Sequence, residues 1–246
     1  MLVLTRTELL KLRSTRWPMI LAAIAVVGTL LLALQPLLKA GHGAPSIGTI
    51  GATLAILDAM SRGSLVALVI GALLVTSEFR HSTITASLLQ VPDRAKLITA
   101  KAAAAVLVGL ALGIACFAVV LLVGAISGAF QPQLVNGDIA LRAMGHILTF
   151  PVYALLGAGI GALWHFNQPL AVLLPAIWLA GLEGLVLATL PQPARTWSLT
   201  SATAGLQNSG TVPMVLPVWL GAVALVGYGL ILVSAGGLRV LRADIS

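Results

Sequence analysis

Few residues in this chain could do chemistry, and they are scattered. The four histidines show no metal-ligand spacing; they are His42, His81, His146 and His165. The chain has no nucleophile–base arrangement, no paired carboxylates and no phosphate loop of the form GxxxxGKS or GxxxxGKT. We therefore expect no catalytic, cofactor-binding or metal site in this chain, and no hydrolysis of ATP by it alone.

Composition predicts a membrane protein. Of the 246 residues, 59% are hydrophobic and 9% are charged, whereas soluble domains usually carry about 25% charged residues. The net charge of +7 does not indicate a nucleic-acid partner, because the basic residues form short clusters between apolar runs, where they set membrane topology. The single cysteine, Cys116, lies within an apolar run and is expected to be a buried thiol.

The apolar runs predict an all-α membrane protein with six spans. The spans are expected at about residues 17–38, 54–77, 102–126, 139–164, 169–190 and 214–238. Residues 1–16 combine leucines with basic residues, which predicts an interfacial helix whose arginines reach the headgroups of membrane lipids. Pro169 and Pro175 put the continuity of the fifth span in question.

The basic residues are distributed unevenly between the two sides of these spans. Ten of the fourteen fall in residues 1–16, 78–101 and 239–246, which six spans put on one side. Cytoplasmic loops are enriched in Lys and Arg, so both termini and residues 78–101 are expected in the cytoplasm, with 191–213 outside. The preference for Ala, Leu, Gly, Val and Arg is typical of proteins from GC-rich bacterial genomes. We therefore expect this chain in a bacterial cytoplasmic membrane.

Three of the charged residues within the predicted spans are candidates for a structural or functional role. Asp58 and Arg62 are four residues apart and can pair on one helix face, either as a structural ion pair or as a gate contact at the outer mouth. Glu183 is the one acidic residue deep in a span, where a charge costs on the order of a few kcal/mol. Two interpretations of Glu183 stay open: contact with a cationic or polar substrate along a pathway, and stabilisation of a break in the fifth span.

Residues 78–101 form a polar segment between two long apolar runs. Ile84, Leu88 and Val91 share one helical face, and Pro92 is expected to end that helix because it disfavours α conformation at the preceding residue. Asp93 can then cap a second helix that enters the third span. A simple reversal needs only about four residues, as at 165–168, so this length predicts a docking surface. The alternative is a solvated basic loop that only fixes topology.

This segment resembles the cytoplasmic loop between the second and third spans in the permease subunits of type-2 ABC exporters. The resemblance rests on Glu78, Ser82-Thr83, Leu88-Leu89, Pro92-Asp93-Arg94 and Lys101. The family often has Gly at the position of Ser82. The basic N-terminal helix, the six spans and the longer loop before the last span are also similar, so the likeness in architecture covers essentially the whole chain.

The resemblance implies a mechanism and a set of partners. Residues 78–101 would hold a coupling helix seated on a separate ATPase subunit, two copies of which would bind ATP and Mg²⁺, and a second permease chain would complete the pathway. Residues 191–213 would include re-entrant segments, and the cargo would be amphipathic: a drug, an antimicrobial peptide or a lipid. The residues expected to couple to the ATPase are Thr83, Ile84, Thr85, Ser87, Leu88, Leu89, Gln90, Pro92 and Arg94.

Two other classes of function stay open. A secondary transporter or channel would need no ATPase, but the spans offer few ionisable residues for ion coupling and the chain has no evident internal repeat. A membrane anchor or assembly factor would leave the helix–proline–helix pattern of residues 78–101 unexplained. Copurification with an ATPase subunit separates the first class from these two.

Overall fold

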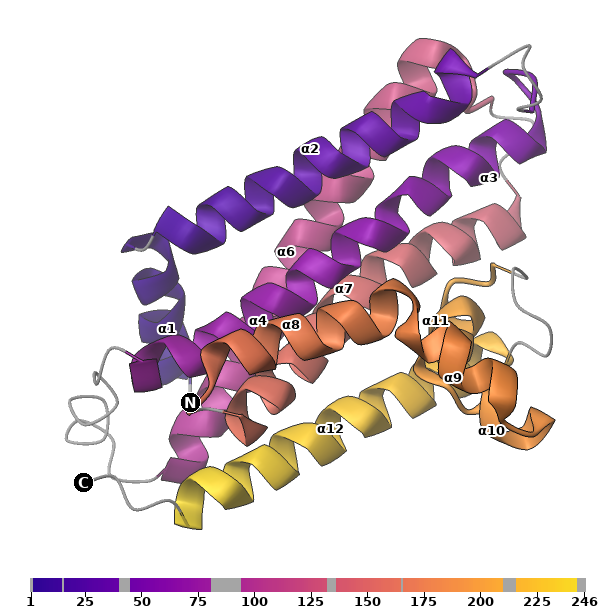
Figure 1. Ribbon diagram of the computed structural model, residues 1–246. Helices are drawn as coiled ribbons and strands as arrows, with labels where there is room; N and C mark the ends of the chain where they lie inside the picture. The colour runs from indigo at the N-terminus through magenta and orange to yellow at the C-terminus, as the bar shows by residue number, and fades with distance from the viewer. Residues whose placement is uncertain are drawn as a thin grey trace.

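The computed structural model describes residues 2–14, 16–39, 45–80, 94–131, 136–164, 166–209 and 216–242. All regular structure in these residues is helical, as the apolar runs predict. Long helices run beside one another as a bundle, with α1 and the end of α12 at the same end of it (Figure 1).

Five described helices are long and apolar enough to cross a membrane. They are α2 (Arg16–Leu38), the stretch made of α3 (Ile50–Asp58), η1 (Ala59–Arg62) and α4 (Gly63–Arg80), α6 (Arg94–Ser127), α7 (Gly137–Leu163) and α12 (Val218–Arg242). Five of the predicted spans fall largely within these helices. The described residues are therefore all-α, with five helices that have the length and composition of membrane spans.

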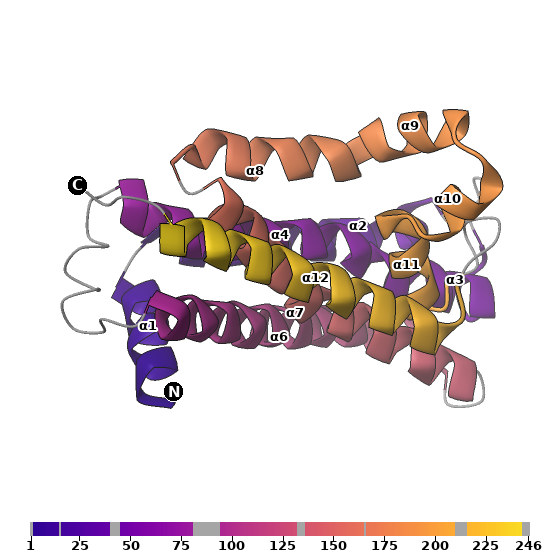
Figure 2. The same ribbon diagram turned by 90° about the horizontal axis from the view of Figure 1, so that it is seen from below.

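The fifth predicted span, 169–190, is interrupted. It consists of α8 (Gln168–Ile177), a π turn (Trp178–Leu182) and α9 (Glu183–Thr189), and Gly181 departs from helical dihedral angles. Pro175 lies inside α8, about one turn before this π turn. Figure 2 shows α8 and α9 as a layer beside the main bundle. The six expected spans are thus five long helices among the described residues, plus this broken segment.

The helix α7 forms the centre of the bundle and packs against α4, α6 and α12. Glycines let α7 approach its neighbours closely: a Cβ atom added to Gly157 would collide with the carbonyl oxygen of Leu68 in α4, and one added to Gly159 would lie 2.6 Å from the Cβ atom of Leu232. Gly109 in α6 likewise leaves room for the backbone of Phe150. At these glycines the backbones of neighbouring helices approach one another closely, as they commonly do where helices associate in lipid.

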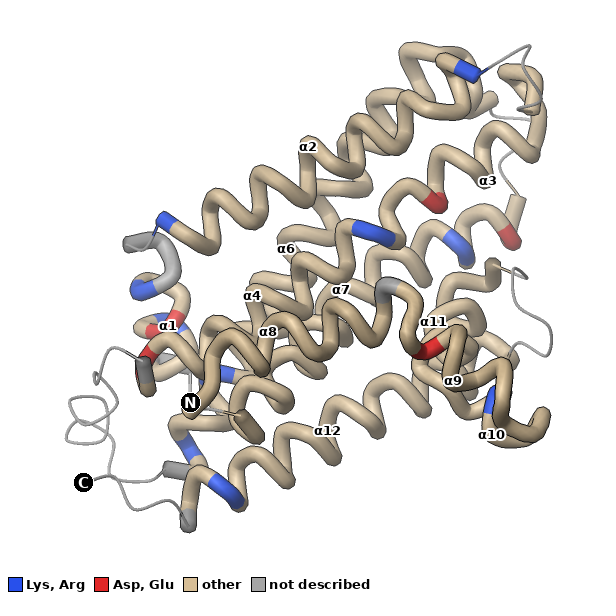
Figure 3. Tube along the Cα trace, viewed as in Figure 1, with Lys and Arg blue, Asp and Glu red and all other residues tan. Residues whose placement is uncertain are grey.

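Short helices occupy both ends of the bundle. The expected interfacial helix is α1 (Leu2–Ser14), which runs in a different direction from α2 (Figure 1). At the opposite end, the segment expected to be irregular contains α10 (Gln192–Thr196) and α11 (Leu199–Leu206). Figure 3 shows the charged residues in two groups, one at the end where α1 lies and one reaching from the start of α4 to α9 and α10, with an uncharged stretch between them. That distribution fits helices whose middle parts face hydrocarbon.

Candidate functional site

Four charged side chains form a cluster at the end of the bundle where α1 lies. The four-charge cluster consists of Glu8, Lys11, Glu78 and Lys101. Lys101 Nζ lies 2.7 Å from Glu8 Oε2 and 2.9 Å from Glu78 Oε1. The Lys101 side chain is only 1% exposed, and Glu8 and Glu78 are also buried. Buried charges are stable only when paired, and here two ammonium groups face two carboxylates.

Lys11 closes the cluster on its solvent side. Its Nζ lies 2.8 Å from Glu8 Oε1 and 2.9 Å from Glu78 Oε1. Partial burial alone would lower the pKa of Lys11, but its hydrogen bonds and attraction to Glu8 and Glu78 outweigh that effect and raise the pKa above its usual value. The four charges therefore compensate one another.

The four-charge cluster joins three elements. Glu8 and Lys11 belong to α1, Glu78 to the last turn of α4, and Lys101 to the second turn of α6. Glu78 pairs with two lysines from two other helices, Lys11 and Lys101. The sequence signal was Lys101 itself, a lone cation just before an apolar run.

Two members of this cluster, Glu78 and Lys101, lie before and after the predicted coupling residues in the sequence. Residues 81–93 lie outside the described residues, and with them Thr83, Ile84, Thr85, Ser87, Leu88, Leu89, Gln90 and Pro92. Arg94 is the first residue of α6. The cluster thus connects the two helices on either side of 81–93, and it fastens both to α1.

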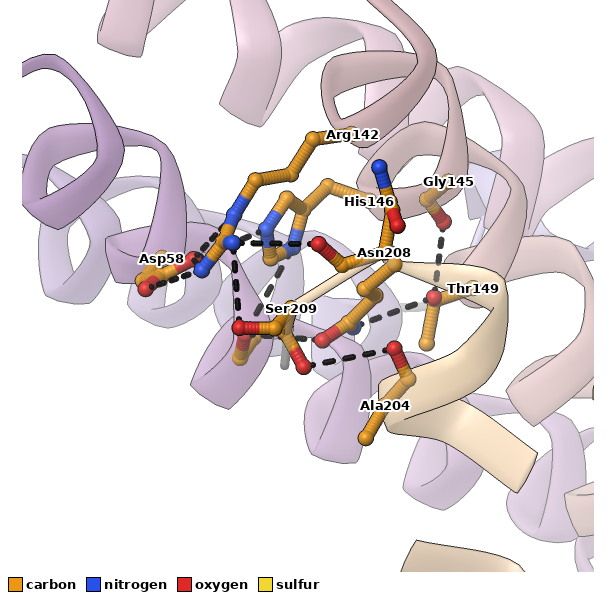
Figure 4. Close-up of polar contacts among 10 residues, drawn as sticks. Asp58, Arg142, Gly145, His146, Thr149, Ala204, Asn208 and Ser209 are labelled. Atoms are coloured by element: carbon orange, nitrogen blue, oxygen red, sulfur yellow. Dashed lines mark hydrogen bonds and ion pairs between the residues drawn. The ribbon is translucent and has the colours of Figure 1, made fainter. Parts of the chain in front are cut away.

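A second polar group lies toward the other end of the bundle (Figure 4). The Asp58 cluster consists of Asp58, Ser61, Arg142, His146, Thr149 and Gln207. Arg142 Nη2 lies 2.7 Å from both carboxylate oxygens of Asp58, and Arg142 Nε lies 3.1 Å from Oδ1. His146 Nε2 lies 3.1 Å from the same Oδ1 atom.

The expected pair of Asp58 with Arg62 is replaced by the pair with Arg142. Residues Ala59–Arg62 form a 3₁₀ turn, in which a residue four positions on no longer lies over the first. Arg62 is exposed, and Asp58 instead faces α7. The sequence did carry a signal for this arrangement, because Arg142 and His146 are four residues apart and share one face of α7.

Arg142 and Gln207 extend this cluster to the end of α11. Arg142 Nη1 donates to the carbonyl oxygens of Asn208 and Ser209, each at 3.1 Å. Gln207 Nε2 donates to Thr149 Oγ1 at 3.1 Å. The Asp58 cluster therefore ties three segments together: the 3₁₀ turn in the second long helical stretch, the central α7, and the chain leaving α11.

Glu183 is the one buried side chain of α9, and its carboxylate faces α11. One of its oxygens accepts the backbone N–H of Thr200 at 3.1 Å, and the other accepts the Thr200 hydroxyl at 2.6 Å. Thr200 lies in the first turn of α11, where unpaired N–H groups favour a negative charge. These contacts favour the structural interpretation of Glu183, because they anchor the helix that follows the break.

Comparison with known proteins adds no relative. The chain matches no protein-family model, and a search of curated proteins finds no match. A function for this chain therefore has to be argued from its residues and their geometry.

Proposed function

We propose that this chain is the permease subunit of an ATP-driven exporter of the ABC type-2 class. The observation that carries the proposal is the contact of Lys101 Nζ with Glu78 Oε1, at 2.9 Å. These two residues bound the segment that resembles the family's coupling loop. A loop that only reverses the chain has no need of a buried ion pair at its base, since burying charges costs free energy.

The four-charge cluster joins the two helices on either side of the proposed coupling helix to each other and to α1. Force applied by an ATPase to residues 83–90 would reach α4 and α6 at their ends, and α1 through Glu8 and Lys11. Separating a buried ion pair costs about 3–5 kcal/mol, so the three helices move as one unit rather than fraying. Closure of two ATPase subunits on ATP and Mg²⁺ then switches the spans between inward and outward access.

The proposed topology follows from the charges and the direction of the helices. Both termini and residues 81–93 lie in the bacterial cytoplasm, in keeping with the excess of Lys and Arg there. The broken segment α8–α9 serves as the sixth crossing, with its interruption next to the short helices α10 and α11. A second permease chain completes the pathway.

The cargo we propose is amphipathic: a drug, an antimicrobial peptide or a lipid. Apolar side chains are exposed along α8 and α9, including Leu173, Ile177 and Leu185, which is 70% exposed. The charged group of α9, Glu183, pairs with Thr200 of α11. Such a surface suits molecules that partition into the bilayer rather than hydrophilic solutes.

The proposal is tested by reconstitution with an ATPase. The candidate partner to be sought is an ATPase encoded in a neighbouring gene, recognised by its own phosphate loop. The two proteins are coexpressed, purified through a tag on the permease, and assayed for copurification and ATP hydrolysis. The test variant is Arg94→Glu, and the matched control is Arg239→Glu, which reverses an exposed charge at the same end of the bundle.

The proposal predicts a stable complex for the unaltered chain and for Arg239→Glu, with Arg94→Glu losing the ATPase by about tenfold or more. Equal association of both variants, or no association with any such ATPase, would contradict it. A chain that transports cargo without an ATPase would instead support the secondary-transporter class.

A further inference from the structure

An aromatic contact lies directly beside the four-charge cluster. Phe79 follows Glu78 in the last turn of α4. Its ring meets that of Phe166, with the ring centroids 6.3 Å apart and the planes inclined by 68°. This edge-to-face arrangement is one that aromatic pairs prefer. The end of α4 that leads into residues 81–93 therefore contacts the connection between α7 and α8.

Phe166 is fastened to the start of α8. The next residue, Asn167, caps this helix, and its side chain accepts the backbone N–H of Leu170 at 3.2 Å. The backbone N–H of Asn167 donates to the carbonyl oxygen of Trp164, at the end of α7, at 2.9 Å. A displacement of the Phe166 ring therefore moves the first turn of α8.

The segment from α8 to α9 contacts the bundle along one narrow stripe. Figure 2 shows this segment as a layer beside the other helices. Its buried and half-buried residues recur at intervals of four: Ala171, Pro175, Leu179 and Glu183. At the far end, the Glu183 carboxylate is bonded to Thr200 of α11. One end of the segment is thus attached to α4, and the other end to α11.

The π turn Trp178–Leu182 lies between these two attachments. A Cβ atom added to Gly181 or Gly184 would have nothing within 4 Å, so the backbone here has room to change its dihedral angles. The helix α8 is regular, and a regular helix moves as one body. Any difference in displacement between the two ends is therefore taken up at the π turn, and such interruptions of a helix often lie at functional sites.

We propose that Phe79 and Phe166 are positioning residues of the transport cycle. They carry a displacement of residues 81–93 to α8, which then swings against α9 at the π turn, while Glu183 keeps α9 with α11. This role rests on the proposed function, because a separate ATPase must displace residues 81–93. It adds to that function the moving part of the broken segment and the side-chain contact that moves it.

The test measures distances within one permease chain in the complex reconstituted with its ATPase. Nitroxide labels are attached to exposed positions in a Cys116→Ala background. The pair Leu173→Cys and Leu185→Cys spans the π turn, and the pair Leu185→Cys and Val223→Cys joins α9 to α12, which packs against α11. The labelled chain is diluted with an excess of unlabelled chain. Pulsed EPR then compares the nucleotide-free complex with the complex trapped by ATP and vanadate.

Trapping should change the distance between labels 173 and 185 by about 3–5 Å and leave the distance between labels 185 and 223 unchanged. Phe166→Ala should abolish this change while the ATPase still copurifies, and Phe166→Tyr, which keeps an aromatic ring, should retain it. Phe166 is 72% exposed, so its truncation leaves the core intact. The matched control, Trp219→Ala, removes a 67% exposed ring from α12 and should retain the change.

A full distance change in Phe166→Ala, equal shifts of both label pairs, or a Phe166→Tyr chain that behaves like Phe166→Ala overturns this role. Loss of the ATPase from Phe166→Ala also overturns it, because the ring would then serve docking. An ATPase that associates and hydrolyses ATP without changing the distance between labels 173 and 185 overturns this role alone. No copurifying ATPase at all overturns the proposed function as well.

Discussion

Lys101 Nζ lies between Glu8 Oε2 and Glu78 Oε1, at 2.7 and 2.9 Å, and so joins α6 to both α1 and α4. An aliphatic side chain there would leave two buried carboxylates with Lys11 as their remaining cation in this cluster. The contact is therefore a point at which one substitution acts on three helices.

We expect Lys101→Met to lower the free energy of unfolding by about 3–5 kcal/mol, because it leaves buried carboxylates undercompensated. The measurement is reversible unfolding of the purified chain in mixed micelles. Lys96→Met, an exposed lysine earlier in the same helix, is the matched control and should change stability by about 0.5 kcal/mol or less. Similar losses of unfolding free energy in both variants would show that the buried contact stabilises the fold no more than an exposed lysine does.

Arg142 contacts Asp58 through two nitrogens and also caps two carbonyl groups, so lysine cannot replace it. We expect Arg142→Lys to cost about 1–3 kcal/mol, less than a fully buried pair because Asp58 is partly hydrated. Arg62→Lys, at the exposed neighbour that does not face Asp58, should leave the unfolding midpoint unchanged. A larger loss of stability in Arg62→Lys than in Arg142→Lys would instead favour the Asp58–Arg62 pair.

Gly157 allows α7 to lie directly against the Leu68 carbonyl group of α4. Gly157→Ala should therefore destabilise the bundle by about 1–3 kcal/mol, because the added methyl group forces backbones apart. Gly227→Ala in α12 is the control, since a Cβ atom there has nothing within 4 Å. It should be neutral or slightly stabilising, by up to about 1 kcal/mol, because alanine favours helix. Thermal unfolding of both proteins in one detergent checks the contrast.

Glu183 can be tested by separating its hydrogen bonds from its charge. Glu183→Gln keeps an acceptor for the Thr200 N–H and a donor for the Thr200 hydroxyl oxygen, so we expect near-normal stability and transport. Glu183→Ala loses both bonds and should cost about 1–3 kcal/mol. Full stability with abolished transport in Glu183→Gln would instead assign the charge to cargo contact.

The amino-acid sequence by itself determined the features that depend on neighbouring residues. Long apolar runs predict helices that can cross a membrane, and five of the six predicted spans fall largely within such helices. The prolines at 169 and 175 marked the span that is broken. Residues 81–93, with most of the predicted coupling contacts, lie outside the described residues, so that part of the prediction stays a prediction.

Tertiary structure alone decided which charged groups meet. The local rule that pairs residues four apart suggested Arg62 for Asp58, but a 3₁₀ turn and the packing of α7 supply Arg142, 84 residues away in the chain. Glu78 likewise pairs with Lys11 and Lys101, and Glu183 with Thr200, across different helices. Periodicity reports which residues share a face of one helix. It does not report which face of another helix lies opposite, because that depends on how all the helices pack at once.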